Sequence, residues 1–98
     1  MRLHNRQIRA QFWVDSEVIN WSRDKRLFYI GLWQLADDSG CLQDDPVLIR
    51  GQVFPFDIDI TADMIATWLD ELVDAGQIVR YTAGNKRCIW LVNFRKHQ

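Results

Sequence analysis

The most informative stretch of the sequence runs from residue 61 to residue 93 and reads TADMIATWLDELVDAGQIVRYTAGNKRCIWLVN. Its first half places apolar residues at helical spacing, and Thr61 and Gly76 suit the start and the end of that helix. Its second half holds two runs rich in β-forming residues, 78–82 and 87–93, separated by a short Gly-Asn turn. The stretch therefore predicts a helix followed by a β-hairpin.

The residues before this stretch predict further helices. Ser22 is a good N-cap for a helix that we expect to run through Asp38. Asp45, followed by proline, starts a helix over 46–54, and the residues 41–43 form a very short strand. We expect an extended segment over 8–14 and a short helix over 15–21 at the beginning of the chain.

From residue 22 onward the expected order is helix, short strand, helix, helix, strand, turn, strand. This is the order of a winged helix-turn-helix, an α+β fold with a three-helix core and a β-hairpin wing. The N-terminal segment would be an addition to it. We divide the chain into an N-terminal arm with a short helix (1–21) and the winged helix-turn-helix (22–98), together one compact domain.

Composition narrows the class of protein. The chain has 98 residues, of which 48% are hydrophobic and 26% charged, so it is typical of a single globular domain. It has neither a long apolar run nor a secretory signal, which predicts a cytoplasmic protein without membrane contact. Cys41 and Cys88 have no nearby ligand partners, and His4 and His97 lie at opposite ends, so we expect no metal, no cofactor and no catalytic set.

Charge is strongly segregated along the chain. The net charge is −1, yet residues 1–26 carry +3, residues 27–79 carry −9 and residues 80–98 carry +5. Both ends are positive, which favours an anionic partner that touches both ends. An uneven but merely solvated surface is the alternative explanation.

A set of short strings adds a family resemblance. They are Ile8–Trp13 (IRAQFW), Arg26–Trp33 (RLFYIGLW), Ala36–Gly40 (ADDSG), Val53–Pro55 (VFP), Asp70–Gly76 (DELVDAG) and Asn93–Gln98 (NFRKHQ). In order and spacing they resemble the N-terminal domain of bacteriophage replication proteins of the replisome-organiser type, related to DnaD-like primosomal proteins. The resemblance implies a winged-helix DNA-binding domain that acts in phage replication initiation and continues into a longer protein.

DNA affinity comes mainly from Lys and Arg side chains that meet phosphates. The helix over 61–75 has no basic residue and carries Asp63, Asp70, Glu71 and Asp74, which phosphates would repel. We therefore expect the wing and the basic arms to contact duplex DNA with weak sequence readout, helped by hydroxyls on that helix. The candidate residues are Arg2, Arg6, Arg9, Thr61, Thr67, Arg80, Lys86, Arg87, Arg95 and Lys96.

Tryptophans offer a second way to hold nucleic acid, because indoles stack on single-stranded bases. Trp33 and Trp68 lie among apolar neighbours at helical spacing and are expected in the core. Trp13 is undecided, and Trp90, near the wing, is the residue best placed to stack.

Two other functions fit the sequence. The acidic helix 61–75 could dock a basic partner, which makes the chain a protein–protein adaptor for a helicase, a helicase loader or a second copy in a homodimer. A phage transcriptional regulator is the second alternative.

Overall fold

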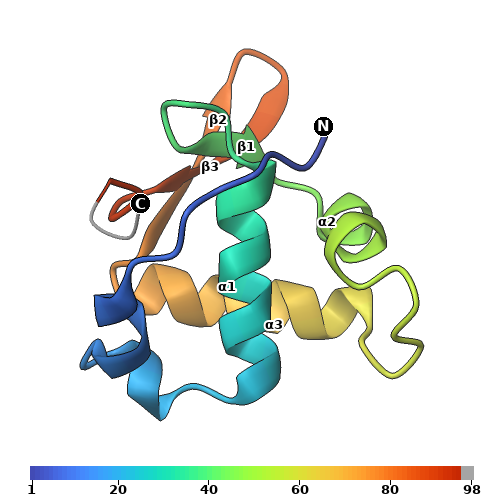
Figure 1. Ribbon diagram of the computed structural model, residues 1–98. Coiled ribbons are helices and arrows are strands. Elements are labelled where there is room, and N and C mark those ends of the chain that lie inside the picture. Colours follow the sequence, from blue (N-terminus) through green and yellow to red (C-terminus); the bar gives the residue numbers. More distant parts are fainter. Residues whose placement is uncertain (96–98) are drawn as a thin grey trace.

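The computed structural model describes residues 1–95 (Figure 1). They form an α+β fold whose α-helices are α1 (Arg23–Leu35), α2 (Pro46–Val53) and α3 (Ala62–Asp74). The strands are β1 (Cys41–Gln43), β2 (Ile78–Ala83) and β3 (Lys86–Leu91). Two 3-10 helices, η1 (Ala10–Val14) and η2 (Val18–Asn20), precede α1. The element order predicted from residue 22 onward is confirmed.

Each α-helix begins at the cap that the sequence predicts. The Ser22 hydroxyl accepts a hydrogen bond from the Lys25 N–H, and the Thr61 hydroxyl accepts one from the Met64 N–H. The Asp45 carboxylate accepts the N–H groups of Val47 and Leu48. These side chains satisfy N–H groups that a helix start leaves without intrahelical partners.

The strands form one antiparallel sheet in the order β1-β3-β2, so β1 is an edge strand and β3 is central. Leu42 stands opposite Ile89, and Ile89 stands opposite Arg80; Leu42 and Ile89 are buried beneath the sheet. The alternate residues, among them Trp90, point to the other face because strand side chains alternate in direction. We call these two sides the inner and the outer face of the sheet.

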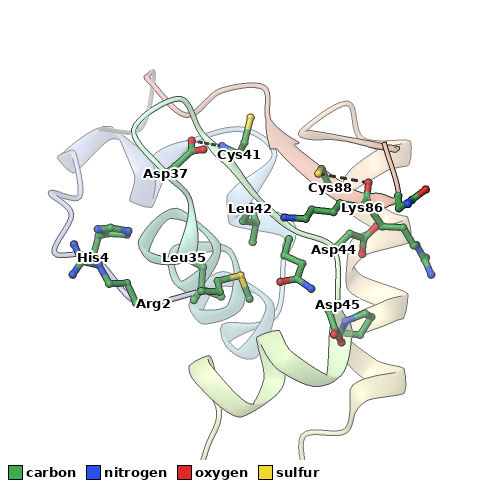
Figure 2. Close-up of a pocket in the computed structure, with 15 residues that line it drawn as sticks. Arg2, His4, Leu35, Asp37, Cys41, Leu42, Asp44, Asp45, Lys86 and Cys88 are labelled. Carbon is green, nitrogen blue, oxygen red and sulfur yellow. Dashed lines mark hydrogen bonds between the residues drawn. The ribbon is translucent and has the colours of Figure 1, made fainter. Parts of the chain in front are cut away.

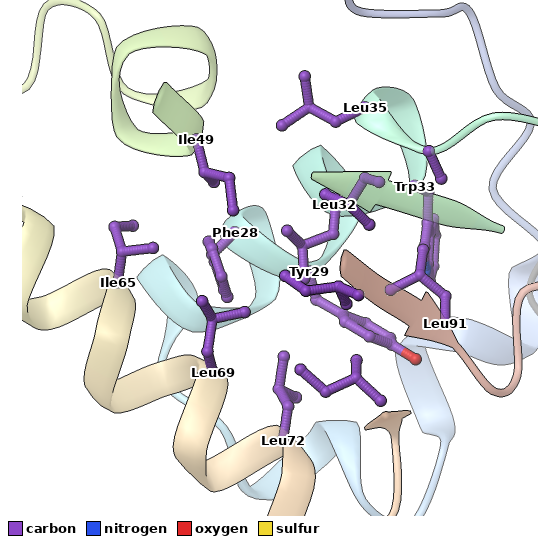
Figure 3. Close-up of a cluster of buried hydrophobic side chains, with 14 of the residues drawn as sticks. Phe28, Tyr29, Leu32, Trp33, Leu35, Ile49, Ile65, Leu69, Leu72 and Leu91 are labelled. Atoms are coloured by element: carbon purple, nitrogen blue, oxygen red, sulfur yellow. The ribbon is translucent and has the colours of Figure 1, made fainter. Parts of the chain in front are cut away.

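The core lies between the inner face of the sheet and the helices (Figure 3). Phe28, Tyr29, Leu32 and Trp33 of α1 are fully buried, and α3 packs beneath them. In Figure 1, α3 crosses α1 steeply, and the sheet lies at the C-terminal end of α1. The expected core position of Trp33 is confirmed.

The N-terminal segment covers the remaining side of α1. The expected extended conformation over 8–14 is wrong, because residues 10–14 form η1. The tight turn lets Phe12 enter the core while its neighbours Trp13 and Val14 stay exposed. The Phe12 ring is fully buried and meets the Trp33 ring edge-on at 5.0 Å. The segment that follows is a single 3-10 turn, η2, rather than a helix over 15–21.

The helix α1 is shorter than predicted, because it ends at Leu35 and not at Asp38. The Asp37 carboxylate accepts hydrogen bonds from the N–H groups of Ser39 and Cys41, and its own N–H donates to the Cys41 carbonyl. A short side chain that satisfies local N–H groups in this way competes with helix continuation. The turn brings the chain back into β1 through Gly40, whose φ is +84°.

Trp68, expected in the core, is only half-buried, against the Phe28 and Phe54 rings. Leu27 of α1 is 56% exposed. The hairpin also differs slightly, since β3 covers residues 86–91 instead of 87–93. Across residues 1–95, none of the helices has the length and apolar character needed to cross a membrane.

Candidate nucleic-acid interface

An open groove of about 1010 Å³ lies over β1, beside the C-terminal end of α1 (Figure 2). Arg2 and His4 of the N-terminal arm stand on one side of it, and Lys86 of the hairpin stands on the other. Arg87 also lines the groove, next to Lys86. Cations from the two ends of the chain therefore meet around one depression.

The arm reaches the groove because Arg6 fastens it to the end of α1. The Arg6 guanidinium donates to the carbonyl oxygens of Trp33 and Ala36, at 3.2 and 2.8 Å. It also pairs with Asp38 at 3.3 Å and lies 5.1 Å from the centre of the Phe94 ring. Its side chain is only 15% exposed. Arg6 thus holds the arm, and Arg2 is the residue that the arm presents.

The hairpin is held against β1 by its backbone. The Asp44 N–H donates to the Arg87 carbonyl at 2.9 Å, just beyond the ladder in which Gln43 stands opposite Cys88. The side chains of Lys86 and Arg87 are exposed, and neither forms an ion pair with the described residues. Their charges are available to a ligand in the groove.

Arg80, also on the hairpin, is in a different situation. Its guanidinium binds both carboxylate oxygens of Asp44, at 2.8 and 3.0 Å, and the Asp70 carboxylate at 2.9 Å. The side chain of Asp44 is 3% exposed, so this is a largely buried pair that ties β2 to β1 and α3. The hydrogen bonds from Arg80 to Asp44 raise the pKa of the guanidinium further above its ordinary value. Arg80 is occupied by these carboxylates.

The acidic residues that line the groove are Asp37, Asp44 and Asp45, and each has an internal partner. Asp44 is neutralised by Arg80, whereas Asp45 and Asp37 accept backbone N–H groups at the α2 cap and in the turn before β1. Hydrogen bonds and N–H dipoles offset much of the potential of a carboxylate. The unpaired cations therefore outweigh the acids in the groove.

The structure brings together three of the predicted contact residues: Arg2, Lys86 and Arg87. Arg9 and Arg95 are exposed but do not line the groove. The Thr61 hydroxyl serves as the α3 cap, Thr67 is exposed on α3, and Lys96 lies outside the described residues.

Sequence reasoning predicted the Asp45 cap of α2 but neither of the ion pairs that Asp44 and Asp38 form. Asp44 forms the buried pair with Arg80, and Asp38 pairs with Arg6. It also missed His4 as a lining residue. Nothing local marks these residues, because their partners lie far away in the sequence.

Comparison with known proteins gave no match to a protein-family model, to a curated protein or to a solved structure. Function is therefore inferred from this groove and from the residues around it.

Proposed function

We propose that this chain is a winged helix-turn-helix domain that binds DNA phosphates through the groove between its N-terminal arm and its wing. The main support is that one groove is lined by Arg2, from one end of the chain, and by Lys86 and Arg87, from the other. Phosphate oxygens bind readily to exposed guanidinium and ammonium groups, and such contacts dominate affinity for DNA. The β2–β3 turn is the wing in this reading.

Sequence readout by α3 is disfavoured in this mode. Asp63 and Asp74 are exposed on α3, and its hydrophobic residues Ile65, Leu69 and Leu72 are buried. In Figure 1 the β2–β3 turn projects at the top, while α3 crosses the lower part of the molecule. Phosphate contacts at the wing can then form without driving α3 into a groove of the duplex. The resemblance to phage replication proteins supports a role in replication initiation.

Fluorescence anisotropy with a labelled duplex tests the proposal. Three phosphate contacts predict that affinity falls about 40-fold between about 50 and 200 mM salt. Lys86→Glu should weaken binding about tenfold at low salt and reduce the slope of log affinity against log salt by about one.

Arg23→Glu is the matched control, because it makes the same change of charge at the exposed start of α1. That position is about 18 Å along the helix from Leu35, which lines the groove. Duplex binding that is absent at low salt, or equally weakened by Arg23→Glu, would contradict the proposal.

A second function, protein–protein adaptor, is favoured by the loop between α2 and α3. Phe56 is 92% exposed and Ile58 is 91% exposed, and Asp57 and Asp59 alternate with them. The loop is braced from within, because the Arg50 guanidinium donates to the carbonyl oxygens of Ile60 and Asp57 at 2.7 and 3.3 Å. A braced loop that exposes two large apolar side chains beside acids suits an apolar pocket with a basic rim.

An amphipathic peptide of Leu and Lys is a matching probe for this loop. If the adaptor function holds, NMR chemical-shift changes should concentrate on residues 55–60 and disappear in Phe56→Ser/Ile58→Ser. The variant should keep the stability of the parent, since both side chains are exposed. If the chemical-shift changes are spread over all acidic residues and are the same in the variant, the peptide binds by non-specific charge attraction and the adaptor function is contradicted.

A further inference from the structure

The outer face of the sheet carries exposed aromatic residues. Trp90 of β3 is 42% exposed and Tyr81 of β2 is 39% exposed. In register, Trp90 stands between Val79 and Cys41, and the next row is Tyr81, Cys88 and Gln43. The buried Leu42, Ile89 and Ile78 show that the core packs on the inner face only.

The Tyr81 side chain extends across this face. Its hydroxyl is 3.4 Å from the Cys41 sulfur, although Tyr81 is on β2, Cys41 is on β1 and β3 runs between them. Because neighbouring strands are about 4.8 Å apart, the side chain has to extend across β3 to reach β1. The ring is thus held over the sheet beside Trp90, and Tyr81 is still 39% exposed.

The charge of the outer face suits a polyanion. The outward-pointing strand residues are Cys41, Gln43, Val79, Tyr81, Ala83, Lys86, Cys88 and Trp90, of which Lys86 alone is charged. The Tyr81 hydroxyl is neutral at physiological pH, as in any ordinary tyrosine, and the hydrogen bond to Cys41 raises its pKa further, to about 12. No carboxylate on the strands would repel a phosphate.

The outer face is also continuous with the cationic groove. Cys41, Gln43, Lys86 and Cys88 belong to this face and line the groove as well. A chain of nucleotides whose phosphates meet Lys86 would therefore have its bases beside the exposed rings.

We propose that the outer face of the sheet is a stacking platform for unpaired bases of a single-stranded nucleic acid, with Trp90 and Tyr81 as the stacking residues. This inference rests on the proposed function and names its preferred ligand. A duplex offers no π-faces along its length, because each base is already stacked between its neighbours. Only unpaired bases can use both the rings and the cations.

Anisotropy titrations with labelled oligo(dT), oligo(U) and a duplex test the platform. Trp90→Ala should lower affinity for the single strand about 5- to 150-fold, with less than a twofold change for the duplex. Trp90→Phe should retain most of the affinity and keeps the test valid if the alanine variant folds poorly. Trp13→Ala is the matched control, because Trp13 is 54% exposed on η1, away from the sheet.

The outcomes separate the two proposals. Duplex binding that depends on Lys86, with single-strand affinity unaffected by Trp90→Ala and Tyr81→Ala, overturns the platform and leaves the proposed function standing. If the unmodified protein binds neither the single strands nor the duplex, both the platform and the proposed function are overturned. Self-association that Trp90→Ala abolishes without nucleic acid would assign the face to a protein contact and overturn the platform. Comparison of oligo(dT) with oligo(U) shows whether a DNA or an RNA strand is preferred, and either preference supports the platform.

Discussion

Two surfaces of this molecule differ in charge and in which charged side chains are paired internally. One is the groove side, around the groove over β1, and the other is the α2–α3 side, around the loop that joins these helices. At the groove, Arg2, Lys86 and Arg87 remain open to solvent, while the neighbouring carboxylates are engaged internally. On the α2–α3 side, the loop between the two helices exposes carboxylates and two large apolar side chains, and Arg50 is used internally to hold the loop. One side suits a polyanion and the other suits a basic protein surface.

The contrast shows that counting charges along the sequence identifies the sign of a region but not its free charges. Arg80 and Arg87 lie on the same hairpin, yet Arg80 holds two carboxylates and Arg87 holds none. Likewise Asp70 and Glu71 of α3 are paired, with Arg80 and Lys25, whereas Asp63 is exposed without an ion pair among the described residues. On each side, internal ion pairs use some of the charged side chains, and the remaining ones determine the charge that the surface presents to a partner.

Removing Arg80 should have the largest effect on stability. Arg80→Ala leaves the Asp44 carboxylate buried without its cation, and we expect the free energy of unfolding to fall by about 3 kcal/mol. Chemical denaturation measures the loss. Arg87→Ala should instead preserve stability and weaken DNA binding. Arg80→Met/Asp44→Leu, which removes both charges, should recover most of the lost stability; no recovery would mean that the pair is not the cause.

Releasing the N-terminal arm should have the second-largest effect on stability. Arg6→Gln removes the charged donor to the Trp33 and Ala36 carbonyls, and we expect a loss of about 2 kcal/mol. Because the arm would no longer hold Arg2 at the groove, the salt slope of DNA binding should also fall by about one. Arg2→Gln is the control, since it should reproduce the change in slope without the loss of stability. A stable Arg6→Gln protein with reduced binding would place Arg6 at the interface.

Two glycines test the packing that fixes the α2–α3 side. A Cβ on Gly31 of α1 would lie 2.6 Å from a methyl carbon of Val53 on α2, so Gly31→Ala should destabilise by about 1–2 kcal/mol. Nothing lies within 4 Å of a Cβ on Gly51, and Gly51→Ala should stabilise by about 0.5–1 kcal/mol. Thermal melting of the two variants gives the comparison. Equal shifts would mean that α1 and α2 are not in close contact.

The smallest expected effect on stability concerns Tyr29, the tyrosine in the core. Tyr29 is fully buried and donates to the Gln77 side chain at 3.1 Å, and burial raises its pKa above the ordinary value. The stability from keeping Tyr29 protonated is complete below about pH 10 and is lost as pH rises further, because the unfolded chain ionises first. Tyr29→Phe should cost about 1 kcal/mol at neutral pH and make the alkaline decline shallower. Chemical denaturation of the parent and the variant at pH 8, 10 and 11 measures the decline. A decline that is the same in both proteins would contradict the buried position of the Tyr29 hydroxyl.

Local chemistry explains why much of the fold was predictable. Ser22, Asp45 and Thr61 start helices through hydrogen bonds to N–H groups within three residues, so the signal and its effect lie in the same short segment. The hairpin is likewise a contact between neighbours in sequence. The conformation of the N-terminal segment was mispredicted because Phe12 is placed by Tyr29 and Trp33, which a local pattern does not include.

The sequence alone specified the α+β element order, the caps and the separation of charge into positive ends and a negative middle, because these follow from residue type and close spacing. Folding decided which cations stay free. Arg6 and Arg80 were drawn into contacts with partners 27 to 36 residues away, at the α1 end and at Asp44, while Arg2, Lys86 and Arg87 were left at one groove. Such contacts depend on where distant segments meet in space, and that is set by packing of the whole core rather than by any short stretch of chain.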